Sequence, residues 1–342
     1  KSLSKDPNTK SIVPLWCVEG KRHKRMTEPK VSKIKNILNT IKGQMAATPR
    51  VTQELFQTVF KEMGKNPDYV SSFQAPGSLL NQRVSASRRF AAQSFEFSRF
   101  RAISKALDVT INDVILAVCS GALREYLISQ NALPKKPLIA MVPASFRDDQ
   151  SDMSNRITMI LANLGTHKAS PLERLEMIIR SVKNAKQRFR RMTPNQILNY
   201  SAFVYGAAGI NILSGVMPKR QAFNIVISNV PGPSEPLYWN GARLEALYPA
   251  SIVLDGQALN ITMTSYLGKL EVGLLGCRNT LPKMQNLLTH LEDEIQRFES
   301  LMHEKMQEQA SKGQLDKDVA APIELALIIK DQAEEAKTKK PA

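Results

Sequence analysis

Residues 258–277 read ALNITMTSYLGKLEVGLLGC, two apolar runs separated by Leu267 and Gly268. Apolar runs of this length that flank a short glycine-containing pair predict two strands joined by a tight turn. Alternation along a strand divides the first run between an apolar face and a polar face: Leu259, Ile261 and Met263 against Asn260, Thr262 and Thr264. The segment therefore predicts an antiparallel hairpin, and the fold must contain a sheet.

The rest of the pattern mixes strands and helices. Continuous apolar runs predict strands at 138–146 and 156–164, buried on both faces, and a strand at 223–233 that ends in a Pro-Gly turn. An apolar stripe that follows Pro171 predicts a helix over 171–192. Weaker patterns predict the remaining elements: helices at 31–47, 51–64, 98–107 and 282–306, a strand near 88–94 and an ordered loop over 65–86. This mixture predicts an α/β (α+β) fold, a mixed sheet with flanking helices.

The stretch TINDVILAVCSGAL, residues 110–123, places Asn112 and Asp113 at the start of a strongly apolar run. Thr110 followed three residues later by Asp113 is typical of a capping box, which satisfies free amides at a helix start. An acidic side chain there also favours the positive end of the helix dipole. We therefore interpret Asn112 and Asp113 as a structural motif at a helix start; the alternative is a catalytic amide and carboxylate.

Composition argues against several classes of protein. The cysteines at 17, 119 and 277 are far apart and form no CxxC, which disfavours a disulfide scaffold and a zinc site. The four histidines are scattered without metal-binding spacing, so no metal is expected. The net charge is +16, and residues 1–106 hold 20 Lys and Arg against 7 Asp and Glu. Such a surface attracts anions or simply keeps the chain soluble, but it lacks the interleaved aromatics of nucleic-acid-binding proteins.

Two long blocks carry the most specific pattern: FNIVISNVPGPSEPLYWNGARLEALYPAS at 223–251 and LDGQALNITMTSYLGKLEVGL at 254–274. NDVILAVCSGALREYL, PLIAMVPASFR and NRITMILANL extend it toward the N-terminus. Together these blocks resemble the bacterial wax ester synthase/diacylglycerol acyltransferase family. The resemblance covers about residues 1–300 and excludes residues 307–342.

The resemblance implies an O-acyltransferase of neutral lipid synthesis, which transfers a fatty acyl group from acyl-CoA to diacylglycerol or a long-chain alcohol. Acyl-CoA is then a substrate, and no cofactor is expected. The implied fold is similar to the two-lobed CoA-dependent acyltransferases related to chloramphenicol acetyltransferase, and this chain resembles the C-terminal lobe. Implied partners are the N-terminal lobe of the same enzyme and, peripherally, the inner membrane or lipid inclusions of the cytoplasm.

In this family the second histidine of an HHxxxDG motif is the general base that activates the acceptor hydroxyl. This sequence contains no two adjacent histidines, so we expect no catalytic residue in it, and His167 does not match the motif. The opening KSLSKDP resembles the segment just after HHxxxDG. We therefore expect a fragment that is inactive alone; the alternative is a non-catalytic module that binds acyl-CoA or lipid.

Polar residues on two predicted strands are candidates to line a CoA channel or to stabilise an oxyanion: Ser228, Asn229, Asn260, Thr262 and Thr264. A polar face on a buried strand can line a thioester tunnel and donate hydrogen bonds. The alternatives are a solvent-facing side for the strand at 258–266 and ordinary turn chemistry for positions 228 and 229.

Residues 197–217 form an uncharged stretch of 21 residues. Its length permits a membrane span, but its Asn, Ser and Gly content favours a buried helix. Small residues at 206–209 allow close approach, so Gly206 and Gly209 are candidates for an acyl or alcohol pocket, Gly209 as a selectivity position. A basic stripe suits CoA phosphates, an anionic membrane or a solvated helix end: Lys183, Lys186, Arg188, Arg190 and Arg191.

The expected domain organisation has four parts. Residues 1–30 are the end of the N-terminal lobe and a linker, and residues 31–86 are crossover helices and a loop. Residues 87–306 form the C-terminal acyltransferase lobe, and residues 307–342 are a variable, disordered tail with one apolar patch, IELALII at 323–329.

Overall fold

The computed structural model describes residues 3–8, 70, 74–146, 156–192, 197 and 222–311. The helices predicted at 31–47 and 51–64 lie outside the described residues, as do Gly206, Gly209 and all of 197–217 except Ile197. The chain divides into two compact units, residues 1–69 with 235–245 and residues 70–234 with 246–342.

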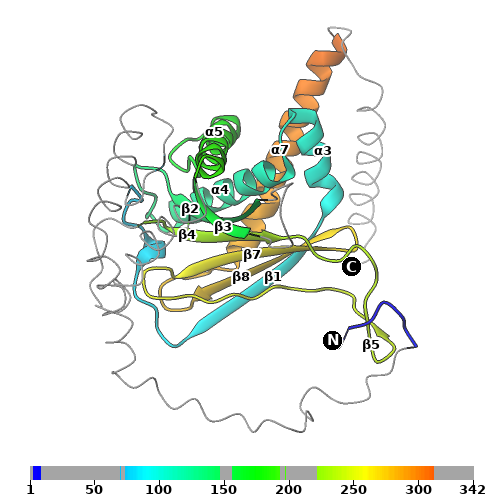
Figure 1. Ribbon diagram of the computed structural model, residues 1–342. Coiled ribbons are helices and arrows are strands. Elements are labelled where there is room, and N and C mark those ends of the chain that lie inside the picture. The colour runs from blue at the N-terminus through cyan, green and yellow to red at the C-terminus, as the bar shows by residue number, and fades with distance from the viewer. Residues whose placement is uncertain are drawn as a thin grey trace, which may run out of the picture. The chain divides into compact units, whose positions relative to one another are not determined.

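The larger unit contains a six-stranded mixed sheet (Figure 1), with strand order β1-β8-β7-β4-β2-β3. Strand β4 runs parallel to β2 and β7, and the other pairs are antiparallel. The strands are β1 Arg88–Glu96, β2 Ile139–Phe146, β3 Arg156–Asn163, β4 Ile225–Val230, β7 Leu259–Tyr266 and β8 Lys269–Cys277. The predicted mixed sheet with flanking helices is confirmed.

The hairpin expected at 258–277 is formed by β7 and β8, which pair from Leu259↔Gly276 to Tyr266↔Lys269. Leu267 and Gly268 make the two-residue turn, with φ of 46° and 80°. Positive φ at both positions matches the turn type whose twist suits two antiparallel strands. Strand β1 then pairs with β8 along its whole length, so residues about 180 positions apart in the chain become neighbours.

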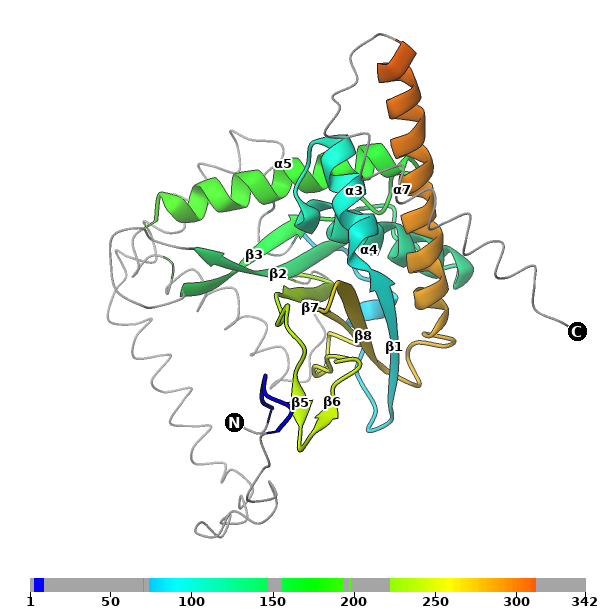
Figure 2. The same cartoon turned by 90° about the vertical axis from the view of Figure 1, so that its right-hand side faces the viewer.

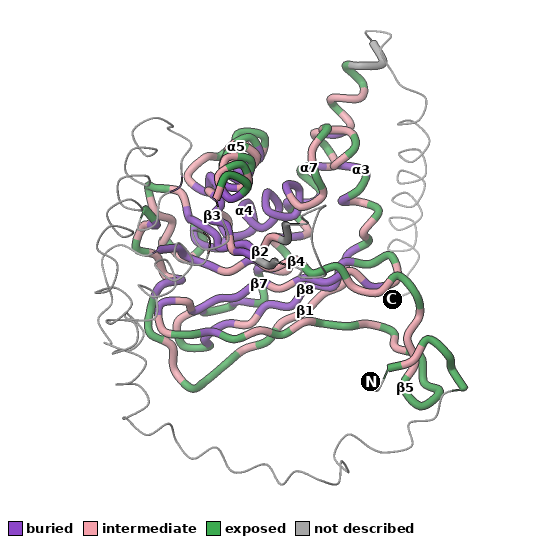
Figure 3. Tube along the Cα trace, viewed as in Figure 1, coloured by how far each residue is buried: buried purple, intermediate pink, exposed green. Residues whose placement is uncertain are grey.

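Helices α3 (Phe97–Leu107), α4 (Ile111–Ser129), α5 (Pro171–Arg190) and α7 (Asn286–Ser311) lie on one face of this sheet (Figures 1 and 2). Their apolar stripes and the strands form one continuous core, seen as the buried layer between sheet and helices (Figure 3). Helix α4 is the most deeply placed, because almost every side chain from Val114 to Leu123 is buried. Burial of this kind is the main favourable term in folding.

The start of α4 contains the expected capping box. The Asp113 amide donates to Thr110 Oγ1 over 3.2 Å, and the Thr110 amide donates to Asp113 Oδ2 over 3.2 Å. The Thr110 hydroxyl adds a third hydrogen bond, to Asp113 Oδ2, at 2.6 Å. Asp113 is buried, and its carboxylate is occupied by these local bonds.

Helix α7 corrects one expectation about the C-terminal tail. It continues to Ser311, whereas the sequence predicts an irregular tail from residue 307. Met302 is buried and Met306 packs against the core, so apolar contacts at a four-residue spacing carry the helix further than its charged outer positions suggest. Residues 312–342 lie outside the described part of the chain.

A buried ion pair joins the helices. Arg174 on α5 and Glu294 on α7 are each 1% exposed, and Arg174 Nη2 donates to Glu294 Oε1. Arg297 Nη1 donates to the other carboxylate oxygen over 3.2 Å. Burial raises the pKa of Glu294, and the two guanidinium groups oppose that rise. A side chain at Gly121 on α4 would overlap the Glu294 carboxylate, so the glycine provides the space for the pair.

Two buried asparagines hold β4 in place at its start. Asn224 Oδ1 accepts from the Ile139 amide over 2.8 Å, and Asn224 Nδ2 donates to Asn81 Oδ1 over 2.6 Å. Asn81 Nδ2 in turn donates to the Gly256 carbonyl over 2.8 Å. These bonds connect the loop before β1, strand β2 and the turn before β7, and thereby fix the strands that carry the candidate site.

The smaller unit contains the hairpin of β5 (Tyr238–Trp239) and β6 (Ala242–Arg243), closed by Asn240 and Gly241 at positive φ. Ser4 pairs with Tyr238 through two backbone hydrogen bonds of 2.9 and 2.7 Å. Residues 3–8, expected to belong to a linker, are thus tied to this hairpin in their described part.

Candidate functional site

The face of the sheet away from the helices carries most of the candidate residues. Alternation along β7 directs Leu259, Ile261 and Met263 into the core, as expected. The side chains on the opposite face of β7 and their register partners on β4, β8 and β1 form one surface, the polar face. Its residues are Asn260, Thr262, Thr264, Ser228, Glu271 and Ser94. The structure therefore brings four of the five predicted lining residues onto one surface.

The β7 part of the polar face is only partly open to solvent. Asn260 and Thr264 are buried, and Thr262 and Ser228 are half-buried. The Thr262 hydroxyl donates to Asn260 Oδ1 over 2.7 Å, which leaves the Asn260 amide group as a donor. Two hydroxyls and an amide thus converge on adjacent positions of β4 and β7.

The structure separates Ser228 from Asn229. Ser228 is paired with Thr262, whereas Asn229 is paired with Met263, and adjacent residues on a strand face opposite sides. Asn229 is half-buried on the helix-covered face. Only Ser228 of this pair lies on the polar face.

A rigid turn closes the end of β4. Gly232 donates its amide to Ser265 Oγ over 3.1 Å, and a side chain at Gly232 would overlap the Ser265 carbonyl. The Pro-Gly turn of SNVPGP is therefore held directly against the end of β7. This close approach explains the glycine and fixes the end of the strand that carries Ser228.

Glu271 on β8 belongs to the polar face and was not predicted from the sequence. It is fully buried, its Oε2 accepts from the Ser94 hydroxyl, and its Oε1 has no hydrogen-bond partner. Ser94 Oγ also lies 2.9 Å from the Tyr248 hydroxyl. The sequence contained one indication of this site: a single carboxylate, Glu271, in the largely apolar strand KLEVGLLGC. A buried carboxylate is costly unless it has hydrogen-bond partners, so its presence there suggests a specific role.

The segment that contains Tyr248 crosses the polar face at close range. A side chain at Gly273, between Glu271 and Leu275 on the same face, would overlap the Pro249 carbonyl oxygen. Near this segment the surface becomes apolar and exposed, with Phe90 at 47% and Ile252 at 69% exposure. The polar face thus combines buried hydrogen-bonding groups with an apolar, exposed margin.

The other predicted residues lie elsewhere. Asn112, half-buried, and Asp113 lie at the start of α4, on the helix side of the sheet. His167 follows β3, has a buried Nδ1 without a partner, and has a pKa lowered by burial and by the nearby Lys168 and Arg124. None of these three residues belongs to the polar face.

The predicted basic stripe lies on the last half of α5. Lys183, Arg190 and Arg191 are exposed, and Lys186 and Arg188 are half-buried. Arg180, one turn earlier, is paired with Glu176. The helix thus ends in a cluster of cations, which also suits its negative C-terminal dipole end.

Within the described ranges, no group of three or more His, Cys, Asp or Glu side chains could hold a metal ion. Among the described helices, none alone is long and apolar enough to cross a bilayer; α3 and α4 satisfy that test only as a pair bent by 105°.

Comparison with known proteins identifies the family. Residues 1–115 match the sequence model of the wax ester synthase/diacylglycerol acyltransferase catalytic domain. Residues 153–299 match that of the WS/DGAT C-terminal domain. The chain belongs to the wax ester synthase/diacylglycerol acyltransferase family. The two matched domains follow one another along the chain, and the second contains β4, β7, β8 and hence most of the polar face.

Individual relatives agree with this family. The chain is 76% identical over 302 residues to "O-acyltransferase WSD" of Acinetobacter baylyi. The matched region covers 88% of this chain and 66% of that protein. It is 39% identical over 305 residues to "Probable diacyglycerol O-acyltransferase tgs2" of Mycobacterium tuberculosis, covering 87% of this chain and 65% of that protein. The chain therefore spans just under two thirds of the length of these relatives.

A solved structure supports the fold. The wax ester synthase/diacylglycerol acyltransferase from Marinobacter aquaeolei VT8 matches with a TM-score of 0.66 and 39% sequence identity. The match covers 88% of this chain and 63% of that chain. The predicted fold class, the mixed-sheet fold of this acyltransferase family, is thus confirmed.

Proposed function

We propose that this polypeptide is the part of a neutral-lipid O-acyltransferase that follows the HHxxxDG motif, and that it supplies the wall of the acyl-CoA and acceptor site. The complete enzyme would transfer a fatty acyl group from acyl-CoA to diacylglycerol or a long-chain alcohol. The observation that carries this proposal is the 76% identity to the Acinetobacter O-acyltransferase over 302 residues. Such identity supports a shared fold and a shared reaction.

The chemistry defines what the polar face has to do. The acceptor oxygen attacks the thioester carbonyl, the carbon–sulfur bond breaks, and the released thiol keeps the proton that the acceptor loses. The carbonyl oxygen becomes negative during the attack, so donors placed beside it lower the barrier. The hydroxyl of Ser228 and the side-chain amide of Asn260 are donors on adjacent positions of β4 and β7, and the Thr262 hydroxyl, which donates to Asn260 Oδ1, orients that amide. Their role as lining of the CoA channel or oxyanion site is part of the proposal.

The general base is not among the residues of this chain, since no HH pair occurs in it. We therefore expect the isolated chain to form no ester from labelled acyl-CoA with either hexadecanol or diacylglycerol. Fusing it behind the N-terminal third of the Acinetobacter relative, which would supply HHxxxDG, should restore ester formation. The matched control is the same fusion with the second histidine of the motif changed to alanine.

Two outcomes would contradict different parts of the proposal. An inactive fusion that is folded and binds acyl-CoA would contradict the proposed function. Ester formation by the isolated chain would contradict the assignment of the base to HHxxxDG. In the active fusion, Ser228→Ala removes a proposed oxyanion donor and should lower kcat by about 10²-fold or more. Thr262→Val removes only the group that orients Asn260 and should lower kcat less, whereas Asn229→Ala, on the other face, should change it little.

A second candidate function is a non-catalytic module that binds acyl-CoA or lipid. The observation that favours it is the set of buried hydrogen-bonding side chains on the polar face, which the chain itself contains. Such a module would bind palmitoyl-CoA as the isolated chain, and the fusion would gain no activity. The coding sequence upstream of Lys1 distinguishes the two candidates directly, because an HHxxxDG codon run in frame would favour the enzyme.

We also propose that the enzyme acts from the cytoplasm while bound peripherally at the inner membrane or at lipid inclusions. The exposed cations Lys183, Arg190 and Arg191 at the end of α5 support this, since each basic side chain near an anionic surface contributes about 1 kcal/mol. Binding to phosphatidylglycerol vesicles should weaken steeply from low to high salt and on changing all three residues to glutamine. A loss of acyl-CoA binding with unchanged vesicle binding would instead assign the cluster to CoA phosphates.

A further inference from the structure

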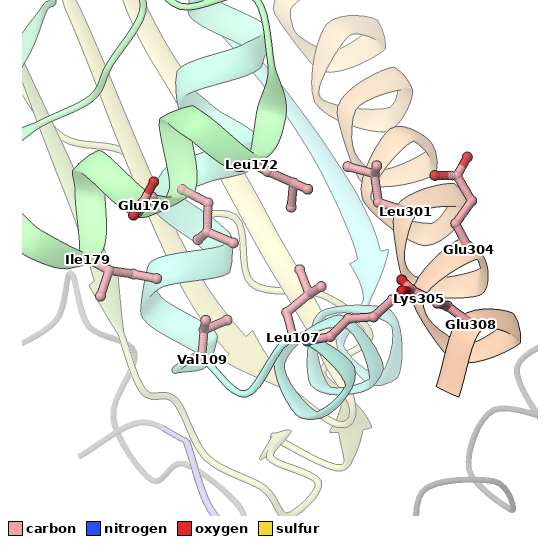
Figure 4. A pocket seen from close by; sticks show the side chains of 10 residues that line it. Leu107, Val109, Leu172, Glu176, Ile179, Leu301, Glu304, Lys305 and Glu308 are labelled. Atoms are coloured by element: carbon pink, nitrogen blue, oxygen red, sulfur yellow. The ribbon is translucent and has the colours of Figure 1, made fainter. Parts of the chain in front are cut away.

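A groove opens on the helix layer, where α3 ends and α5 and α7 pass on either side of it. Its volume is about 510 Å³, within the range of roughly 300–1,000 Å³ that small ligands occupy. Figure 4 shows Leu107, Leu172 and Leu301 pointing toward one another from three different helices. The other lining residues come from α5, from α7 and from the loop after α3: Val109, Leu175, Glu176, Ile179, Glu304, Lys305 and Glu308.

The groove has an apolar floor and a mainly acidic rim. Leu172 is 45% exposed, and Leu107, Val109 and Ile179 are half-buried, so apolar surface remains in contact with water. Three rim residues are glutamates and one is Lys305. Glu176 is paired with Arg180, so Glu304 and Glu308 against Lys305 leave the rim with a small negative excess, which gives the phosphates of acyl-CoA or of anionic lipids no cationic partner set. An exposed apolar groove of this kind marks a docking surface.

The chain itself contains a matching segment. Residues 312–342 follow α7, and within them IELALII, residues 323–329, has six apolar residues around Glu324 and is followed by Lys330. Glu324 and Lys330 complement Lys305 and the acidic rim respectively. The matched family domain ends at residue 299, so both this segment and the α7 side of the groove lie beyond it.

The connection is long enough. Leu301 lies ten residues before the end of α7 at Ser311, a distance of about 15 Å along a helix. The eleven residues between Ser311 and Ile323 can span up to about 35–40 Å when extended. They contain Gly313, which permits a reversal of direction. The tail can therefore turn back along α7 and reach Leu107 and Leu172.

We propose that residues 323–329 pack into the groove between α3, α5 and α7, so that the C-terminal tail of this chain covers its own apolar surface. Insertion of Leu325, Leu327 or Ile329 places aliphatic side chains against Leu107, Leu172 and Leu301. Mutual burial removes two apolar surfaces from water at once, which is the driving force for such docking. This inference is independent of the proposed catalytic function.

Disulfide trapping in the full chain tests the proposal. The variant pair Leu172→Cys with Leu327→Cys is compared with Leu172→Cys with Leu315→Cys, which keeps one cysteine in the groove and moves the other to the connection. Oxidation is followed by mass spectrometry of the linked peptides, with the natural cysteines present in both. We expect the 172–327 link to form at least about tenfold faster, although loop closure alone would favour the position closer to α7.

Equal rates for the two pairs, or no 172–327 link, would overturn the proposal. A 172–327 link found only between two molecules, with a rate that rises with protein concentration, would also overturn it and assign the groove to a second copy. Each of these results is independent of ester formation, so the proposed function is tested separately.

Truncation provides a second measurement. Ending the chain after Ala321 should lower the thermal midpoint by a few degrees, on the order of 2–4 °C, and ending it after Ile329 should leave the midpoint unchanged. Leu172→Asp should lower the midpoint of the full chain but add little to the shorter truncation, because both changes remove the same contact. Full additivity of the two changes would contradict docking at Leu172.

Discussion

Two glutamates of the described chain are almost completely buried, one on each side of the sheet. Glu294, on the helix side, has two arginine partners, a glycine that makes room for it and a close-packed surround. Glu271, on the polar face, has one hydroxyl partner and one carboxylate oxygen with none. Both carboxylate oxygens of Glu294 thus have an arginine partner, although Arg174 Nε has none, whereas only one oxygen of Glu271 has a partner.

The difference shows how the two sides are used. A buried ion pair adds little net stability, but removal of one partner leaves the other charge buried and is strongly destabilising. An incompletely satisfied buried polar group is the exception in folded proteins and occurs where a site has other demands. Glu294 therefore joins α5 to α7 through paired charges, whereas Glu271 keeps one oxygen without a partner on the face that carries the proposed lining residues.

The largest expected effect separates the two glutamates. Glu294→Ala leaves Arg174 buried without a counter-charge, and should lower the free energy of unfolding by about 3–5 kcal/mol. Glu271→Ala removes one hydrogen bond while Ser94 keeps Tyr248, and should cost about 1–2 kcal/mol. Urea unfolding of both variants measures this difference, with Asp293→Ala as the exposed control. Equal losses for the two glutamates would contradict the contrast between the faces.

An intermediate effect is expected from two glycines on β8. Gly273 faces the backbone carbonyl of Pro249, whereas Gly276, on the helix side, faces the Met284 and Leu281 side chains. Gly273→Ala must displace the segment across the polar face and should destabilise the chain by about 1–3 kcal/mol. Gly276→Ala needs only side-chain adjustment, so it should cost less. A larger loss for Gly276→Ala in urea unfolding would show that the crossing segment is easily moved.

A pH dependence of stability is expected to distinguish two buried cysteines. Burial raises the pKa of Cys119 on α4 to about 12. Burial also acts to raise the pKa of Cys277, but hydrogen bonds from Ser85 and Thr280 outweigh it and lower that pKa to about 6 from the ordinary 9.0. The thiolate of Cys277 is thus favoured in the folded chain. Its contribution to stability is complete above about pH 9 and is lost as the pH falls through 6.

Urea unfolding at pH 6 and pH 9 checks this. Cys277→Ala should remove part of the pH dependence between these values, while Cys119→Ala should leave the dependence in this window unchanged. The same pH dependence in wild type and Cys277→Ala would show that Ser85 and Thr280 do not favour the thiolate.

Several elements could be predicted because their signals are local. The Leu267-Gly268 turn needs only two residues at positive φ between alternating runs, and the structure has it at that place. The Thr110–Asp113 capping box involves backbone and side chains three residues apart. Helix α5 begins at Pro171 and ends near the predicted residue, because its N-cap Ser170 and its apolar stripe are both local patterns in the sequence.

Other features escaped prediction because they depend on partners distant in the chain. The extension of α7 to Ser311 follows from contacts of Met302 and Met306 with the core. The separation of Ser228 from Asn229 follows from the strand register against β7. The surroundings of Glu271 depend on β1, which supplies Ser94, and on the segment with Tyr248, which contacts Ser94.

Periodicity, caps and turns in the amino-acid chain were sufficient to predict an α/β fold, the β7–β8 hairpin and the capping box of α4, since each depends on neighbouring residues. Strand order, the face on which each polar side chain lies and the groove between α3, α5 and α7 came from packing. They depend on contacts between residues that are up to about 200 positions apart, such as Arg99 with Glu299. A local sequence pattern does not indicate which distant residues form such contacts.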